Sequence, residues 1–168
     1  MSYLRKIIFP ALLIGLVITD SCNKGIEPVY DSPGFSGRLT FKGAWPDSIK
    51  RTFIVVFDSL LEEPDDFTLY NLKFISGEIP TGISYFDYDS RDSALVQIDP
   101  GTYSYVAVIQ QKTETISLLR KDWIVAGIYY ANSDTSYPGR LIIPSDGFVR
   151  NINILCDFDN PPPQPPGG

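Results

Sequence analysis

The 168-residue sequence predicts an all-β protein, folded as a single antiparallel β-sandwich of about seven or eight strands. Its apolar segments are short and rich in β-branched and aromatic residues, which favour strands. Several of them alternate apolar and polar residues, which is the period of a strand with one buried face. Turn-forming residues separate the segments, including 14 prolines and 13 glycines, and no segment after the N-terminus predicts a long helix.

The first two strands are predicted over residues 36–42 and 51–57. Residues 36–42 place Leu39 and Phe41 on one face and polar residues on the other, so we expect this strand to be half-buried. Residues 51–57 are continuously apolar after Thr52. That composition is typical of a central strand covered on both faces.

A short helical turn is predicted at residues 60–64, ending at Pro64, because the residue before a proline disfavours helical geometry. Two more strands follow along the chain. Residues 70–74 alternate regularly, and residues 83–88 form an aromatic-rich strand.

The next segment predicts a β-hairpin. Its first strand alternates over residues 94–98, its turn is Asp99-Pro100-Gly101, and its second strand covers residues 102–110. Proline fits the second position of a β-turn and glycine the third, where φ is positive. The remaining predicted elements are a single helical turn at residues 116–121 and strands at residues 123–130, 139–143 and 148–158.

Residues 98–106 (IDPGTYSYV) resemble the L-x-PGxY-x-v signature of carboxypeptidase-regulatory-like and other transthyretin-like modules. In that family a strand, a Pro-Gly turn and an aromatic residue form the signature hairpin. The resemblance implies a transthyretin-like (prealbumin) topology, which we favour over other immunoglobulin-like sandwiches.

The first 21 residues have the organisation of a secretory signal peptide. Arg5 and Lys6 precede an unbroken apolar run over residues 7–18. A helix of this length rises about 18 Å, less than the roughly 30 Å of a bilayer's hydrocarbon core, so a spanning helix is disfavoured. A buried core helix is disfavoured too, because the run has no polar face.

The apolar run leads to Thr19-Asp20-Ser21-Cys22, and the segment resembles a bacterial lipoprotein signal of the Bacteroidetes type. The resemblance implies cleavage before Cys22, acylation of Cys22, and attachment to the cell envelope. We expect an outer-membrane lipoprotein that faces either the periplasm or the surface. Ordinary secretion, with Cys22 free or disulfide-bonded, is the alternative.

The rest of the chain divides into three parts by composition. We expect residues 22–34 to be the lipidated cysteine and a flexible tether, and residues 35–159 to be the β-sandwich domain. Residues 160–168 (NPPPQPPGG) are predicted to be a disordered, exposed Pro/Gly tail, since proline can neither pair in a sheet nor extend a helix.

The composition excludes several classes of function. No histidine is present, which excludes Ser-His-Asp and Cys-His catalysis and histidine-based metal sites. Two cysteines are too few for a Cys₄ site. The excess of 20 Asp and Glu over 14 Lys and Arg argues against a nucleic-acid partner. We therefore expect a protein that is not an enzyme and has no cofactor.

One cysteine and one group of acidic residues are candidates for chemical sites. Cys156 is in phase with Ile154 and Phe158, which predicts a buried hydrophobic residue rather than a nucleophile. Three acidic residues have the alternate spacing of calcium loops, but the glycine and glutamate of an EF-hand are missing. A solvated turn is the favoured interpretation of these residues, which are Asp87, Asp89 and Asp92.

Aromatic residues near predicted turns are the remaining candidates for a contact surface, because exposed rings bind proteins or stack on sugars. The four candidates are Trp45, Tyr129, Tyr130 and Tyr137. The competing interpretation is that these rings pack in the core. The sequence thus predicts a non-catalytic interaction or structural module with a protein partner. The alternative is a carbohydrate-binding module that uses exposed aromatics on a polysaccharide.

Overall fold

The computed structural model of the chain describes residues 32–168. The predicted signal peptide, Cys22 and most of the predicted tether lie outside the described residues. Within residues 32–168 the regular elements are strands and two single-turn 3₁₀ helices, so the all-β prediction is confirmed. No helix in this part of the chain is long and apolar enough to cross a membrane.

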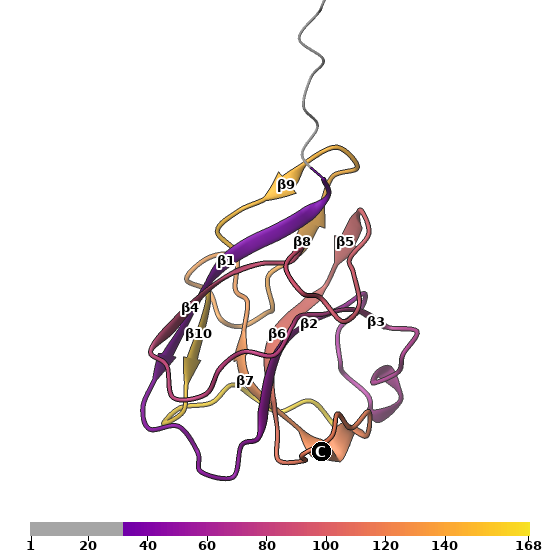
Figure 1. Cartoon of the computed structure of the whole chain (residues 1–168). Helices are drawn as coiled ribbons and strands as arrows, with labels where there is room; N and C mark the ends of the chain where they lie inside the picture. The colour runs from indigo at the N-terminus through magenta and orange to yellow at the C-terminus, as the bar shows by residue number, and fades with distance from the viewer. Residues whose placement is uncertain (1–31) are drawn as a thin grey trace, which may run out of the picture. The chain divides into compact units, whose positions relative to one another are not determined.

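Ten strands follow one another along the described residues (Figure 1). They are β1 (Gly34–Lys42), β2 (Arg51–Phe57), β3 (Leu72–Ile75), β4 (Tyr85–Asp89), β5 (Gly101–Tyr103), β6 (Tyr105–Gln111), β7 (Trp123–Ile128), β8 (Leu141–Ile143), β9 (Phe148–Val149) and β10 (Ile154–Asp157). The two 3₁₀ helices are η1 (Pro64–Asp66) and η2 (Arg120–Asp122).

The strands form two larger sheets and one small one. The first sheet has the order β3-β2-β6-β7 and is antiparallel throughout. The second has the order β10-β1-β4, with β9 also paired to β1. Strands β5 and β8 pair antiparallel as a separate ribbon.

The second sheet differs from the predicted antiparallel arrangement. Strand β1 pairs antiparallel with β4 but parallel with both β9 and β10. Side chains alternate with a period of two in strands of either direction, so the sequence pattern carries no information about the direction of the partner.

One apolar core lies between the two larger sheets and makes the domain sandwich-like. Buried side chains reach it from β1, β2, β6, β7 and β10, among them Leu39, Ile54, Val108 and Ile154. Cys156 is fully buried there as a free thiol, as predicted, and burial raises the pKa of this thiol to about 12.

The other face of the first sheet is also covered. Phe53, Val55 and Phe57 of β2 lie in a second apolar cluster with Tyr105 and Trp123. The prediction that residues 51–57 form a strand buried on both faces is therefore confirmed. This second cluster lies beneath the candidate site described below.

The predicted hairpin around Asp99-Pro100-Gly101 does not form. Strand β5 pairs with β8, and β6 pairs with β2 and β7. Of the predicted first strand, Val96 makes an isolated bridge to Ile75. Gly101 begins β5, and the Tyr103 hydroxyl donates to the carbonyl of Asp99 at 2.6 Å. Pairing with strands distant in the sequence has replaced the local turn.

Two other predicted elements are displaced. Asn151 has a φ of 65°, a left-handed conformation that breaks the predicted strand 148–158 into β9 and β10. Pro64 begins η1 rather than ending a helical turn. Proline suits a first helical position, because its missing N–H would have no partner there.

The C-terminal tail lies against the domain, unlike the disordered and exposed segment expected from its composition. Pro165 is buried, and the side-chain amide of Gln164 both accepts from the N–H and donates to the carbonyl of Val125, each at 2.8 Å. Arg120 donates to the carbonyl of Pro165 at 2.7 Å. Strand β7 is the edge of its sheet, so the glutamine amide occupies the place of a neighbouring strand at Val125.

Candidate functional site

A groove of about 290 Å³ opens beside the end of β7. Its walls come from residues 60–62, the loop between β7 and β8, and the C-terminal tail. Three tyrosines line it, Tyr105, Tyr130 and Tyr137, together with the tail prolines Pro163 and Pro165. We call this feature the tyrosine groove.

The loop between β7 and β8 is held in shape by its backbone. The N–H of Tyr129 donates to the carbonyl of Val106 at 2.9 Å, and the N–H of Gly139 donates to the carbonyl of Tyr129 at 2.7 Å. Only glycine fits at position 139, because a Cβ there would lie 2.5 Å from the nitrogen of Ala131 and 2.8 Å from the Tyr129 ring.

Two side chains stiffen the outer part of this loop. Asn132 accepts a hydrogen bond from the N–H of Asp134 at 2.8 Å, and Asp134 accepts one from the N–H of Ser136 at 2.9 Å. These are turns of the kind that short polar side chains stabilise. The bond from the Ser136 backbone also lowers the pKa of Asp134, since it favours the charged carboxylate.

Tyr105 lies at the inner wall of the groove. Its side chain is 5% exposed and packs edge-to-face on Phe57, with 6.2 Å between the ring centroids. The hydroxyl is buried and has no hydrogen-bond partner within residues 32–168. Burial also raises the pKa of this phenol, so the hydroxyl stays protonated at neutral pH.

The groove has little charge. Glu62 is the one acidic side chain among the lining residues of the described chain, and neither lysine nor arginine is among them. A lining of rings, aliphatic side chains and a few hydroxyls suits a neutral ligand better than an anion.

A second hollow of about 590 Å³ continues from the tyrosine groove. The two share Ile128, Tyr130, Thr135 and Pro163. The second hollow adds the carboxylate of Asp157 and three side-chain amides, those of Asn132, Asn153 and Asn160. Together the two depressions make an apolar floor with an amide-lined extension.

The structure divides the four predicted aromatic candidates. Tyr130 and Tyr137 come together in the tyrosine groove, and Tyr137 is 76% exposed. Tyr129 packs instead against the core between the sheets. Trp45 packs on Phe41, with 4.6 Å between centroids, and its indole N–H donates to a backbone carbonyl at 2.9 Å.

Sequence reasoning missed Tyr105 and the tail as parts of this site. Tyr105 falls inside the predicted strand 102–110, where the pattern predicts that a large ring is buried in the core. The sequence of the tail does not predict its docking, because docking depends on the unpaired edge of β7, which forms only in the folded structure.

Two of the three acidic candidates for a calcium site are paired with arginine, and the third, Asp92, donates its backbone N–H to the carbonyl of Asp89 at 3.0 Å. Arg38 donates to both oxygens of Asp87 at 2.6 and 2.8 Å, and Arg91 pairs with Asp89 at 2.6 Å. These bonds hold the pKa values of both carboxyls below their usual range. Residues 32–168 contain no group of three acidic, cysteine or histidine side chains that could hold a metal ion.

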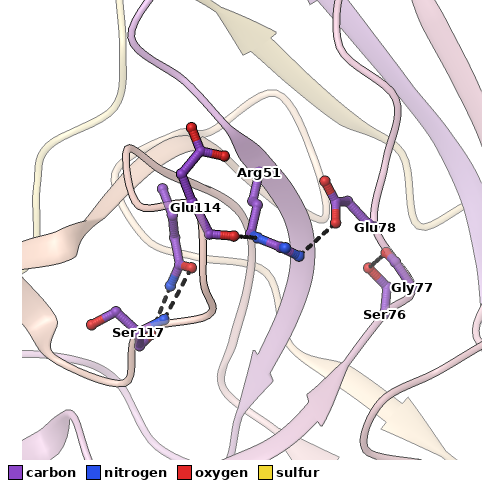
Figure 2. Close-up of polar contacts among 7 residues, drawn as sticks. Arg51, Ser76, Gly77, Glu78, Glu114 and Ser117 are labelled. Atoms are coloured by element: carbon purple, nitrogen blue, oxygen red, sulfur yellow. Dashed lines mark hydrogen bonds and ion pairs between the residues drawn. The ribbon is translucent and has the colours of Figure 1, made fainter.

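A second polar cluster surrounds Arg51 at the start of β2 (Figure 2). Its guanidinium donates to Glu78 at 2.7 Å and to the carbonyl of Glu114 at 2.8 Å. Beside it, the amide of Gln111 donates to the carbonyl of Ser117 at 2.7 Å. The bonds of this cluster link strands to loops within the chain. We therefore assign the cluster a structural role.

No protein family model, curated protein or solved structure matches the chain.

Proposed function

We propose that this chain is a lipid-anchored protein of the bacterial cell envelope whose β-domain is a non-catalytic binding module. The tyrosine groove carries the proposal for the domain. Its rings and prolines offer a contact surface, and among the residues that the structure describes its lining has one carboxylate, Glu62, and no second carboxylate, lysine or arginine. A surface of this kind suits binding rather than acid–base catalysis, which needs paired groups.

The groove's role is tested by placing a diazirine amino acid at position 137 of the chain in living cells. We expect light to produce a slower-migrating adduct, because Tyr137 stands exposed at the groove. The matched control is position 70, whose tyrosine is 91% exposed and is not among the groove residues. Identical adducts from the two positions, or none from either, would contradict a binding role for the groove.

The anchor part of the proposal rests on the N-terminal residues. A positive start, a twelve-residue apolar run and Cys22 in sequence have the order of a lipoprotein signal. Acyl chains on Cys22 would hold the domain at a membrane without a spanning helix. On our proposal this membrane is the outer membrane.

Labelled palmitate tests the anchor. We expect incorporation in the wild type and its loss in Cys22→Ser. Cys156→Ser is the matched control and should keep the label, because Cys156 lies in the core. Equal labelling of the wild type and Cys22→Ser would contradict the anchor.

A transthyretin-like origin of the domain is also part of the proposal. Its support is the sequence of residues 98–106 and the bond from the Tyr103 hydroxyl to the carbonyl of Asp99. The family's hairpin is replaced in this chain by the pairing of β5 with β8. Comparison of the strand order, strand by strand, with that of transthyretin-like domains tests it. A different strand order in the β1 and β2 sheets would contradict it.

A further inference from the structure

The tail, residues 160–168, docks on the edge of β7 through one glutamine that stands between prolines. The amide of Gln164 accepts a hydrogen bond from the N–H of Val125 and donates one to its carbonyl, each at 2.8 Å. A residue of a neighbouring antiparallel strand makes the same exchange of two bonds in a hydrogen-bonded pair. One side chain thus reproduces strand pairing at a single position.

Two further contacts fix the tail beside this position. Arg120, in η2, donates to the carbonyl of Trp123 on β7 and, at 2.7 Å, to the carbonyl of Pro165 in the tail. Burial lowers the pKa of Arg120, and hydrogen bonds from a charged donor are stronger than neutral ones. Pro165 is itself buried, whereas Gln164 and Pro166 on either side of it are exposed. We call the edge of β7 at Val125, together with Arg120, the tail site.

The sequence of the tail matches what the site offers. Prolines on both sides of Gln164 hold the segment extended before it docks, so little chain entropy is lost on docking. Proline has no N–H with which to pair along a strand, so the bonds to Val125 come from the glutamine side chain. The site therefore recognises a particular segment, in which a glutamine lies within a run of prolines.

A short turn joins the tail to the domain. After β10 the N–H groups of Asp159 and Asn160 donate to Asp157 at 3.1 and 3.2 Å, and the tail begins there. The contacts of Gln164 and Pro165 with the tail site are the same whether the tail belongs to this copy or to another. Exchanging an identical segment between copies therefore costs little beyond bringing the copies together.

We propose that the tail site also accepts the tail of a second copy of this chain, so that two copies pair by exchanging residues 160–168. The segment that fits the site is the one that the structure shows in it. Each copy then supplies Pro163 and Pro165 to the tyrosine groove of the other, because both prolines line that groove. This self-association goes beyond the proposed function.

The first experiment uses the peptide NPPPQPPGG, which is the tail itself, and the full chain carrying Gln164→Ala. We expect a saturable NMR shift of the Val125 amide. Wild type should bind the peptide at least about tenfold more weakly, because its own tail competes at a millimolar effective concentration. Equal binding by the two chains, or no binding at millimolar peptide, would overturn the proposal.

A second peptide isolates the glutamine. The same nine residues with Gln164→Ala should bind the variant chain about fivefold to hundredfold more weakly, the value of two neutral hydrogen bonds. An extended strand of a different protein is the competing occupant of a strand edge, and it would need no glutamine. Equal binding of the two peptides would therefore contradict recognition of the tail.

Exchange between copies is tested by mixing two full-chain variants in a Cys22→Ser background. The Gln164→Ala chain has an intact site and a defective tail, and the Arg120→Gln chain has an intact tail and a weakened site. An intact tail meets an intact site only between the two chains. We expect sedimentation velocity to show more dimer in the mixture than in either chain alone, and excess NPPPQPPGG to remove it. A mixture that stays monomeric at concentrations where the peptide binds would overturn the exchange.

Arg140→Gln is the matched control, because Arg140 is an exposed arginine that makes no bond to the tail among those of the described residues. Its tail should stay in its own intact site, so its mixture with the Gln164→Ala chain should contain less dimer. Equal dimer in the two mixtures would contradict the role of Arg120. If Arg120→Gln fails to fold, the two peptide titrations still decide the proposal, since neither uses that variant.

Discussion

Gly37 lies where β1 passes the segment between β9 and β10. A Cβ at this position would overlap the carbonyl group of Ile152. At Ile152 the same carbonyl accepts a hydrogen bond from the buried Tyr88 hydroxyl at 2.6 Å. The backbone cannot retreat without losing that bond, so a single absent side chain sets the distance between the two segments.

We expect Gly37→Ala to lower the free energy of unfolding by about 1–3 kcal/mol through overpacking. Urea denaturation measures the change. Gly101→Ala is the control, because a Cβ there meets only the end of the Tyr103 ring, 3.1 Å away at its hydroxyl. An equal effect at both positions would contradict the close approach at Gly37.

Cys156 makes stability depend on pH. Its folded-state pKa is about 12, whereas an unfolded cysteine titrates near 8.5. The unfolded chain therefore loses this proton first, and stability falls as the pH rises above about 8.5.

Between about pH 8.5 and 10, before tyrosines titrate, the slope from this thiol approaches about 1.4 kcal/mol per pH unit. Urea melts across this range measure the slope in a Cys22→Ser background, which leaves one thiol. Adding Cys156→Ala should flatten the dependence even if the variant is less stable throughout. If stability still falls steeply with pH after this substitution, the pH dependence belongs to another titratable group.

Strand β7 shows how an element can be completed by a side chain. The outer edge of β7 at Val125 is paired by the Gln164 amide rather than by another strand. The tail thereby covers backbone groups that would otherwise be open to another chain.

Gln164→Ala should free the N–H and carbonyl of Val125. We expect the free energy of unfolding to fall by about 1–3 kcal/mol, and hydrogen exchange at the Val125 amide to become faster. Hydrogen exchange with mass spectrometry measures the second effect. Gln97→Ala, at an exposed position outside the tail, should change neither. Unaltered exchange at Val125 would contradict the tail contact.

At the same scale, the sequence predicted strands more reliably than their partners. Residues 51–57 form β2 with the predicted bounds, because a continuous apolar run has few other solutions. The predicted turn at Pro100-Gly101 is not formed, because Gly101 pairs with Ile143 of β8 instead of reversing the chain. A local turn preference is weak beside a ladder of backbone bonds formed with a distant strand.

At the scale of the whole described domain, residues 32–168, the first and last strands close the fold. Strand β10 pairs in parallel with β1, with Leu39 opposite Ile154. Ile154 and Cys156 then reach the core between the sheets, while Leu155 points outward and is 56% exposed. The core is therefore complete only after the last strand has joined the first.

Ile154→Ala should lower the free energy of unfolding by about 2–5 kcal/mol, because it opens a cavity between the sheets. Leu155→Ala, its neighbour on the same strand, should change it by less than about 0.5 kcal/mol. Denaturant melts of both variants make the comparison. Similar losses would contradict the inward orientation of Ile154.

The sequence by itself determined the all-β class, the doubly buried β2 and the burial of Cys156. These depend on hydropathy and its period along the chain, which are local properties. Tertiary structure alone decided the parallel pairing of β1, the union of β5 with β8, and the docking of the tail on β7. It also decided that Tyr130 and Tyr137 share a groove with Tyr105 while Trp45 and Tyr129 pack elsewhere. The physical reason is competition: each strand edge and each ring takes the best partner available in space, and that partner is distant in the sequence.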